Sequence, residues 1–280
     1  MDGHVHIHEC FSLVALLDAA RKNFQSAARE LALPWPCGMV LMLTETATAD
    51  YFGKLRKAAD GRPASEGDAL GTWHIEPTGE ESSVSAVNRE GDRILIVAGH
   101  QIVTREKLEV LALATTKSFP DNDTIDECIR KVQDAGGITV LPWGFGKWIG
   151  SRGRTVRRLI ESSNVTCLHL GDNGGRLRYW PEPAEFRKAQ AKNNLVLPGT
   201  DPLPFQGEEA CVGSFGFALE LDQPIEQPAA AITERLSEPY AHILPYGRSE
   251  KLLRFLRNQA KMQLLKGGQR QNKTRARKPG

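Results

Sequence analysis

The sequence predicts an α/β protein whose strands form a closed or nearly closed barrel. Three observations favour this fold class. Apolar runs alternate with helical patterns along most of the chain, polar residues follow several of the predicted strands, and histidines stand at every second position near the start. Repeated βα units imply a mostly parallel sheet covered by helices, and in such barrels the chemistry lies at the carboxyl ends of the strands. A doubly wound open sheet is the alternative.

The first part of the chain supplies two βα units and an antiparallel insertion. Residues 2–8 alternate as a strand does, and residues 11–32 have helical spacing. The apolar run 38–44 is a buried strand, which a helix at 48–59 and a Gly-, Ala- and Ser-rich loop at 61–71 follow. Three short antiparallel strands are then predicted at 72–76, 83–89 and 92–98.

From residue 107 onward, strands and helices alternate again. Strands are predicted at 109–114, 138–143, 165–171, 195–201 and 215–221, and helices at 123–135, 152–162, 183–193 and 249–265. We therefore predict one barrel domain over residues 1–265.

The composition is that of an ordinary globular protein. The chain has 280 residues, of which 40% are hydrophobic and 25% charged, and no apolar run is long enough to span a bilayer. Five scattered cysteines without a CxxC pair, and no signal peptide, predict the cytoplasm. Residues 266–280 carry six Lys or Arg and no acid, which predicts a disordered tail. A solvated tail without function is expected, and weak contact with nucleic acid is the alternative.

The opening histidines are the strongest chemical signal in the sequence. If residues 2–8 form a strand, His4, His6 and His8 project from one face, with Val5 and Ile7 on the other. Neutral imidazole is the commonest metal ligand, so this stretch predicts part of a metal site.

Two carboxylates follow other predicted strands and could complete that site. Glu45 comes directly after 38–44, and Asp201 ends 195–201. Two imidazoles with one or two carboxylates suit one zinc, iron or manganese ion. Glu45 and Asp201 are also candidates for a general base. The alternative is that Glu45 caps the next helix and Asp201 stabilises its turn.

Two glycine-rich loops, each directly after a strand, are candidates for substrate binding. The loop that begins at Trp143 offers aromatic faces and the cations Lys147 and Arg152. The other loop offers polar side chains, Asp172, Asn173 and Arg176. Among these residues, we predict that Lys147 and Arg176 also stabilise charge during a reaction. The alternative is that the glycines only shape tight turns. Neither loop contains a nucleotide-binding fingerprint.

Several segments together resemble the PHP (polymerase and histidinol phosphatase) superfamily of metal-dependent phosphoesterases. The residues 2–6, DGHVH, resemble its opening D-x-H-x-H, and 39–46 stand where the family has an apolar strand ending in T-D-H. Residues 98–104 and 137–145 resemble two further family segments, and 199–201 resemble its closing G-S-D.

The resemblance implies a distorted (β/α)7-type, TIM-like barrel with metal ligands at His4, His6 and Asp201, and with Glu45 in place of an aspartate. The sequence departs from the family pattern at four other positions, which hold Thr46, Gln101, Trp143 and Leu203. The family assembles two or three metals, whereas this set suffices for one.

Two functions follow from these observations. The first is a metal-dependent, phosphoesterase-like hydrolase that acts on a small anionic substrate with one divalent ion. The second is an inactive PHP-like protein that binds a small anionic ligand through its two loops, since a fold alone does not decide function. Partners beyond such a ligand, and the oligomeric state, are not indicated.

Overall fold

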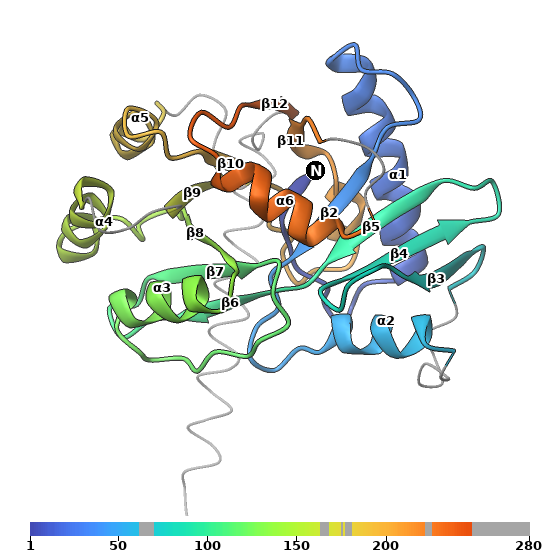
Figure 1. The fold of residues 1–280 in the computed structure, drawn as a ribbon, viewed down its shortest axis with the longest axis horizontal. Coiled ribbons are helices and arrows are strands. Elements are labelled where there is room, and N and C mark those ends of the chain that lie inside the picture. Colours follow the sequence, from blue (N-terminus) through green and yellow to red (C-terminus); the bar gives the residue numbers. More distant parts are fainter. Residues whose placement is uncertain (62–69, 163–167, 175, 177–180, 222–225, 248–280) are drawn as a thin grey trace, which may run out of the picture.

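The computed structural model contains two five-stranded sheets and a separate pair of strands (Figure 1). It describes residues 1–61, 70–162, 168–174, 176, 181–221 and 226–247. The predicted helix at 249–265 and the basic tail at 266–280 lie outside these residues, so both stay predictions.

The first sheet is built from the N-terminal third of the chain. Its strands run in the order β1 (Asp2–Val5), β2 (Met39–Leu43), β5 (Arg93–Val97), β4 (Ser83–Asn88) and β3 (Trp73–Pro77). The first three are parallel to one another, and β3 and β4 extend the sheet as an antiparallel meander. Helices α1 (Leu13–Glu30) and α2 (Tyr51–Ala59) pack on it.

The second sheet holds the middle of the chain. Its order is β10 (Val196–Gly199), β9 (Leu168–Asn173), β8 (Ile138–Pro142), β7 (Glu109–Leu113) and β6 (Gly99–Val103). The three strands from β8 to β10 are parallel, whereas β7 is antiparallel to both of its neighbours. Helices α3 (Ile125–Asp134), α4 (Ser151–Glu161) and α5 (Ala184–Gln190) cover its outer face.

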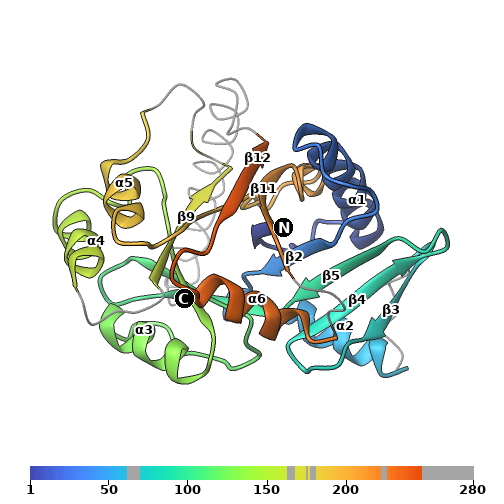
Figure 2. The ribbon, with the colours of Figure 1, turned by 45° about the horizontal axis from the view of Figure 1, so that its top comes forward.

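The last elements fill the space between the sheets, as Figure 2 shows. A 3₁₀ turn η1 (Glu208–Cys211) precedes the antiparallel pair β11 (Phe215–Leu219) and β12 (Ile243–Gly247), and α6 (Pro228–Ser237) lies between these two strands in sequence. Phe217, Ile232 and Leu236 pack in one core cluster with residues of both sheets, such as Met42 and Leu111. This third cluster ties the two sheets together by burial of apolar surface.

Local sequence explains where the helices begin. The Ser12 side chain accepts the Ala15 amide at the start of α1, and that helix buries Leu16, Ala20 and Phe24 along one stripe. At the start of α3, Thr124 and Glu127 form a capping box.

The predicted fold class is wrong. The described strands form mixed sheets of five, five and two strands, and no closed barrel exists among them, so the fold is a sheet-rich α+β arrangement. The physical reason is the length of the connections. Only Ala98 separates β5 from β6, and five residues separate β6 from β7. Such short links exclude the helical crossover that a parallel strand pair requires.

Sequence reasoning also missed α6, β12 and the 3₁₀ turn η1, and it gave β6 only as part of the family resemblance. The first predicted strand, 2–8, is longer than the observed one. The first strand ends at Val5 with an irregular register against β2, so His6 and His8 lie beyond it. Within the described part of the chain, no helix is both long and apolar enough to cross a membrane.

Candidate metal centre

The candidate centre lies where the first strand of one sheet meets the last strand of the other. The Asp201 amide donates to the His4 carbonyl at 2.8 Å, which joins the end of β10 to β1. Both strands need glycine for this approach. A Cβ on Gly3 would lie 2.8 Å from the Pro198 oxygen, and a Cβ on Gly199 would lie 2.3 Å from the His4 nitrogen. These glycines therefore bring His4 and Asp201 together.

A buried carboxylate, Asp2, fixes this junction. Its two oxygens accept the Thr200 amide at 2.9 Å, the Thr200 hydroxyl at 2.6 Å and the Gly213 amide at 2.8 Å. Burial raises the pKa of Asp2, and these hydrogen bonds oppose the rise. Asp2 thus links β1 to Thr200, which precedes Asp201, and to Gly213, which precedes β11.

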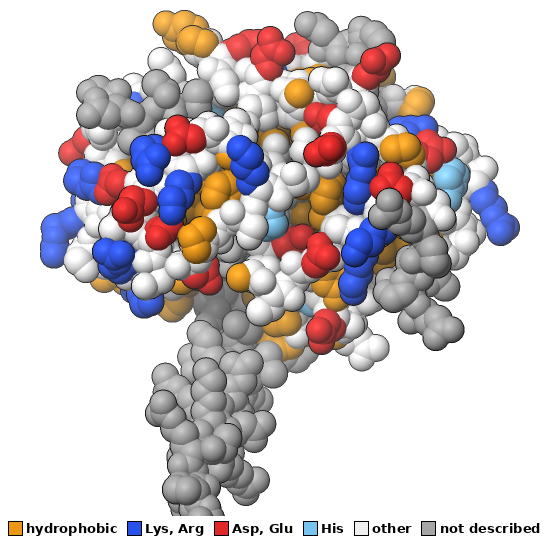
Figure 3. Space-filling view, turned by 60° about the horizontal axis from the view of Figure 1, so that its bottom comes forward, with side chains coloured by type: hydrophobic (Ala, Val, Ile, Leu, Met, Phe, Trp, Pro, Cys, Tyr) orange, Lys and Arg blue, Asp and Glu red, His pale blue; other side chains and the backbone are white. Residues whose placement is uncertain are grey.

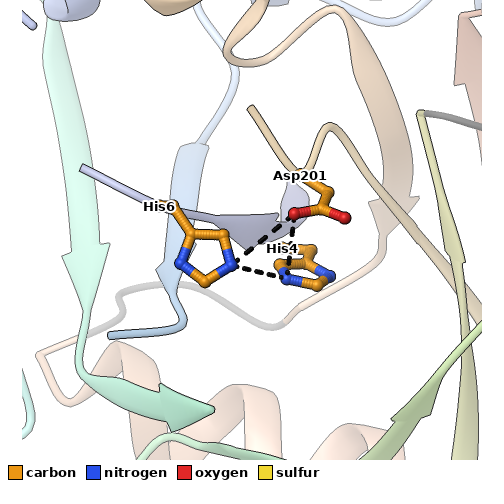
Figure 4. A group of neighbouring side chains, drawn as sticks. All are labelled: His4, His6 and Asp201. Atoms are coloured by element: carbon orange, nitrogen blue, oxygen red, sulfur yellow. Dashed lines mark hydrogen bonds and ion pairs between the residues drawn. The ribbon is translucent and has the colours of Figure 1, made fainter. Parts of the chain in front are cut away.

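Three side chains converge at the junction, as Figure 4 shows. The Nε2 atoms of His4 and His6 are 3.1 Å apart. The Oδ1 atom of Asp201 lies 3.5 Å from His4 Nε2 and 3.6 Å from His6 Nε2. Both histidines are buried, whereas the Asp201 side chain is 26% exposed. Access to the group is therefore from the side of Asp201.

Asp201 is held in an unusual backbone conformation. Its φ of 46° lies in the left-handed region, which aspartate tolerates better than most residues but which is still uncommon. The Asn173 amide donates to Asp201 Oδ2 at 2.9 Å, which turns Oδ1 toward the histidines. Burial alone would raise the pKa of Asp201, but His4, His6, Lys147 and this hydrogen bond lower it below its usual value.

His6 is kept neutral by its surroundings. Burial, then the nearby His4, lower its pKa to about 3, while Asp201 and a hydrogen bond to Gln101 act in the opposite direction. The Thr44 hydroxyl is also 3.5 Å from His6 Nε2. A neutral imidazole has a free lone pair, which is the form that binds a metal ion.

The spacing of the three donor atoms fits a single ion. A circle through atoms separated by 3.1, 3.5 and 3.6 Å has a radius of about 2.0 Å, which matches zinc–nitrogen and zinc–oxygen bond lengths of about 2.0–2.2 Å. Two imidazoles and one carboxylate are also a chemically suitable donor set. Among the described residues, this is the one group of three or more such side chains that could hold a metal.

Glu45, the fourth expected ligand, is engaged elsewhere. Its Oε1 atom accepts the Tyr51 amide at 2.6 Å and the Phe52 amide at 3.0 Å, so it caps the start of α2. Burial raises the pKa of Glu45, against the effect of these two hydrogen bonds. Together with His100 it lines a separate cleft of about 490 Å³. The structure thus shows the capping role that the sequence left open.

The predicted substrate-binding loops lie at the same edge of the second sheet as Asp201. Trp143 follows β8 and donates its amide to the Gly171 carbonyl at 2.8 Å, and Asn173 pairs with Gly199 across β9 and β10. The carboxyl ends of three adjacent parallel strands therefore carry both loops and Asp201, which belongs to the candidate metal group formed by His4, His6 and Asp201.

Each of the predicted anion-binding cations already has a partner in the protein. Lys147 Nζ is 2.5 Å from Glu109, and Arg176 forms a bidentate pair with Asp172 at 2.9 and 2.6 Å. Arg152 donates to the Gly146 carbonyl at 3.0 Å. These contacts order the loops, so a substrate anion would have to share or replace them.

The other histidines are outside the group. His8 donates to the Pro202 carbonyl at 2.9 Å and stacks on His6. His169 is buried in the sheet, where its Nδ1 accepts the Leu195 amide at 3.2 Å, and His74 is exposed beside Glu76. Sequence reasoning missed the linking role of Asp2 and the position of Gln101 beside His6. Asp2 lies two positions before His4 in the predicted strand, and this spacing was the available signal for the role of Asp2.

The comparisons with known proteins support the fold alone. No protein-family model matches the chain, and no significant match among curated proteins was found. A crystal structure of PsfC from Pseudomonas syringae PB-5123 is similar, with a TM-score of 0.50 and 14% sequence identity over 95% of this chain and 97% of that chain. At this identity the similarity indicates a shared arrangement of strands and helices over nearly the whole chain.

Proposed function

We propose that the chain is a metal-dependent hydrolase, phosphoesterase-like, with one divalent ion held by His4, His6 and Asp201. The observation that carries this proposal is the mutual spacing of the three donor atoms, which places one point about 2.0 Å from all of them. Zinc, manganese and iron suit the donors. When bound, such an ion would polarise a substrate oxygen and lower the pKa of a neighbouring water.

The residues around the group supply orientation and charge. Asn173 fixes the rotation of the Asp201 carboxylate, and burial keeps His6 neutral. Lys147 adds positive charge near Asp201, which favours a developing negative charge on the substrate. In the reaction, the water oxygen forms a bond to phosphorus as the bond from phosphorus to the ester oxygen breaks. One water proton goes to the leaving alcohol and the other to solvent.

One face of the molecule carries side chains of both charges. Figure 3 shows Lys and Arg side chains on both sides of a central zone that holds acidic side chains and a histidine. The four described cysteines form no disulfide with one another, which is compatible with the cytoplasm as the compartment we propose.

The test is the metal content and activity of the purified full chain. We expect about one zinc, manganese or iron per chain and metal-dependent hydrolysis of p-nitrophenyl phosphate. The double variant His4→Gln/His6→Gln should lose both. The matched control is His74→Gln, because His74 is 58% exposed and contacts only Glu76 among the ion pairs of the described residues.

Two other results would each overturn a different part of the proposal. Absence of bound metal under every loading condition would overturn the metal centre and leave an inactive protein that binds a small anion. Because two imidazoles and a carboxylate also hold Fe(II) in oxygenases, activity that requires both Fe(II) and O₂ would overturn the hydrolase.

A further inference from the structure

The loop between β8 and α4, residues 143–150, lies at the edge of the sheet that carries the metal group. Pro142 pairs with Gly171 on β9, and Asn173 at the end of β9 pairs with Gly199 on β10. Neighbouring strands are about 4.8 Å apart, so the loop begins about 10 Å from the strand that leads into Asp201. This position is within reach of a substrate bound at the group.

Internal contacts hold this loop in one shape. The Lys147 amide donates to the Gly144 carbonyl at 2.9 Å, and the Arg152 side chain donates to the Gly146 carbonyl at 3.0 Å. Trp148 packs edge-on against the buried Phe186, with ring centres 6.0 Å apart. A loop anchored in this way binds a ligand with little loss of conformational entropy.

The anchored loop presents two apolar side chains to solvent. Phe145 is 60% exposed and Ile149 is 71% exposed, while Lys147 between them pairs with Glu109. Exposed apolar side chains on a rigid loop beside a polar site are typical of ligand recognition.

We propose that Phe145 and Ile149 contact the apolar part of the substrate, which is therefore a phosphate ester of an aromatic or branched alkyl alcohol. This inference rests on the proposed function and specifies its substrate class. The anionic group would lie at the metal group, and the alcohol part would extend along the loop. Two side chains form too small a surface for a stable protein partner, which needs about 800 Å² on each side, but they suit one ring or alkyl group.

Binding of two non-hydrolysable phosphate mimics tests the proposal. Phenylphosphonate and methylphosphonate carry the same anionic group and differ in apolar area. We expect the zinc-loaded full chain to bind the phenyl compound about tenfold more tightly by calorimetry. The variant Phe145→Ser/Ile149→Ser should remove most of that preference, and Ile149→Ser alone should remove part of it.

Two controls keep the outcomes separate. Leu244→Ser removes an exposed apolar side chain on β12, at 44% exposure, and should keep the phenyl preference. Unchanged zinc affinity shows that the loop variants are folded.

Equal binding of the two compounds by the unmodified protein, or a preference that survives in the double loop variant, would overturn the loop's role alone. If neither compound binds the zinc-loaded protein, the loop's role and the phosphoesterase proposal both fail. Altered sedimentation with phosphatidylcholine vesicles, without a change in phosphonate affinity, would instead make the loop a membrane contact.

Discussion

The junction of β1 with β10 and the loops after β8 and β9 lie at the same edge of the second sheet but differ in how their polar side chains are held. At the junction, His4, His6 and Asp201 point their donor atoms at a common centre, and a buried carboxylate fixes the backbone behind them. In the loops, Lys147 and Arg176 are paired with carboxylates of the protein. The donor atoms of the junction are therefore already arranged around one point, whereas the loop charges are already paired with carboxylates of the protein.

The difference shows which part of the site is already arranged for a ligand. The three donor atoms of the junction lie within 3.6 Å of one another, so an ion would find its ligands already in place. The loop charges already have carboxylate partners, so a substrate anion gains little by replacing them. Affinity for metal should thus depend on the junction, and the loops should tolerate substitution.

The largest expected effect on zinc affinity comes from filling the narrow space between β1 and β10. Gly199→Ala places a Cβ 2.3 Å from the His4 nitrogen and 2.6 Å from its Cβ, which forces His4 away from Asp201. We expect zinc affinity to fall more than 100-fold in a competition assay with a coloured chelator. Gly38→Ala is the control, since a Cβ there meets no atom within 4 Å. Full zinc affinity in Gly199→Ala would show that the junction adjusts freely.

Removal of the buried linking carboxylate should reduce the stability of the fold. Asp2→Ala leaves the Thr200 and Gly213 amides without their acceptor. Each buried donor that loses its partner costs about 1–3 kcal/mol, so we expect the free energy of unfolding in urea to fall by about 3 kcal/mol. Asp134→Ala, at an exposed site on α3, serves as control. A change below about 0.5 kcal/mol would contradict the role assigned to Asp2.

The metal-free protein should lose stability in mild acid because of His6. Its pKa is about 3 in the folded chain, whereas an unperturbed histidine, as in the unfolded chain, has a pKa of 6.5. Between these values the unfolded chain binds more protons, so stability is full above pH 6.5 and declines as the pH falls toward 3. We expect a loss of about 2 kcal/mol between pH 6.5 and 5 from this group. His6→Asn should flatten the urea-denaturation profile over this range, whereas His74→Asn should not.

Orientation of the aspartate should matter less than its presence. Asn173→Ala removes the hydrogen bond to Asp201 Oδ2 but leaves all three metal donors in place. Loss of a residue that orients a metal ligand costs about tenfold or more in affinity, so zinc should bind about tenfold more weakly. The Asn173→Asp variant, which has no amide donor, should bind no better than Asn173→Ala at pH 7. Equal zinc affinity in all three proteins would remove Asn173 from the site.

The sequence was sufficient to pick out three residues that lie together in the structure, but not to predict the architecture. Histidines two apart and an aspartate after an apolar run are local signals, and the structure brings His4, His6 and Asp201 together. The strand pairing depends on connection lengths that the apolar pattern does not encode. The single residue Ala98 between β5 and β6 turns the chain from one sheet into the other, and nothing in the hydrophobic pattern marks that change.

The role of Glu45 could be predicted from the sequence only as one of two alternatives. Its place after a strand fits both a metal ligand and a helix cap, and only the position of the Tyr51 and Phe52 amides decides between them. Likewise, the charges of Lys147 and Arg176 were visible in the sequence, but their partners Glu109 and Asp172 were not. For Lys147 the partner is 38 residues away in the chain, which is beyond any local pattern.

The smallest expected effect is in the loops. Arg176→Ala breaks a bidentate pair with Asp172 that is largely shielded from solvent, with side-chain exposures of 15% and 9%. If the pair only orders the loop, zinc affinity should stay within about twofold of the unmodified protein, because the metal donors belong to other strands. Affinity for phenylphosphonate should fall by no more than about threefold. A loss of zinc affinity comparable to that of Asn173→Ala would show that Asp172, once released, disturbs Asn173 beside it, and the contrast between junction and loops would fail.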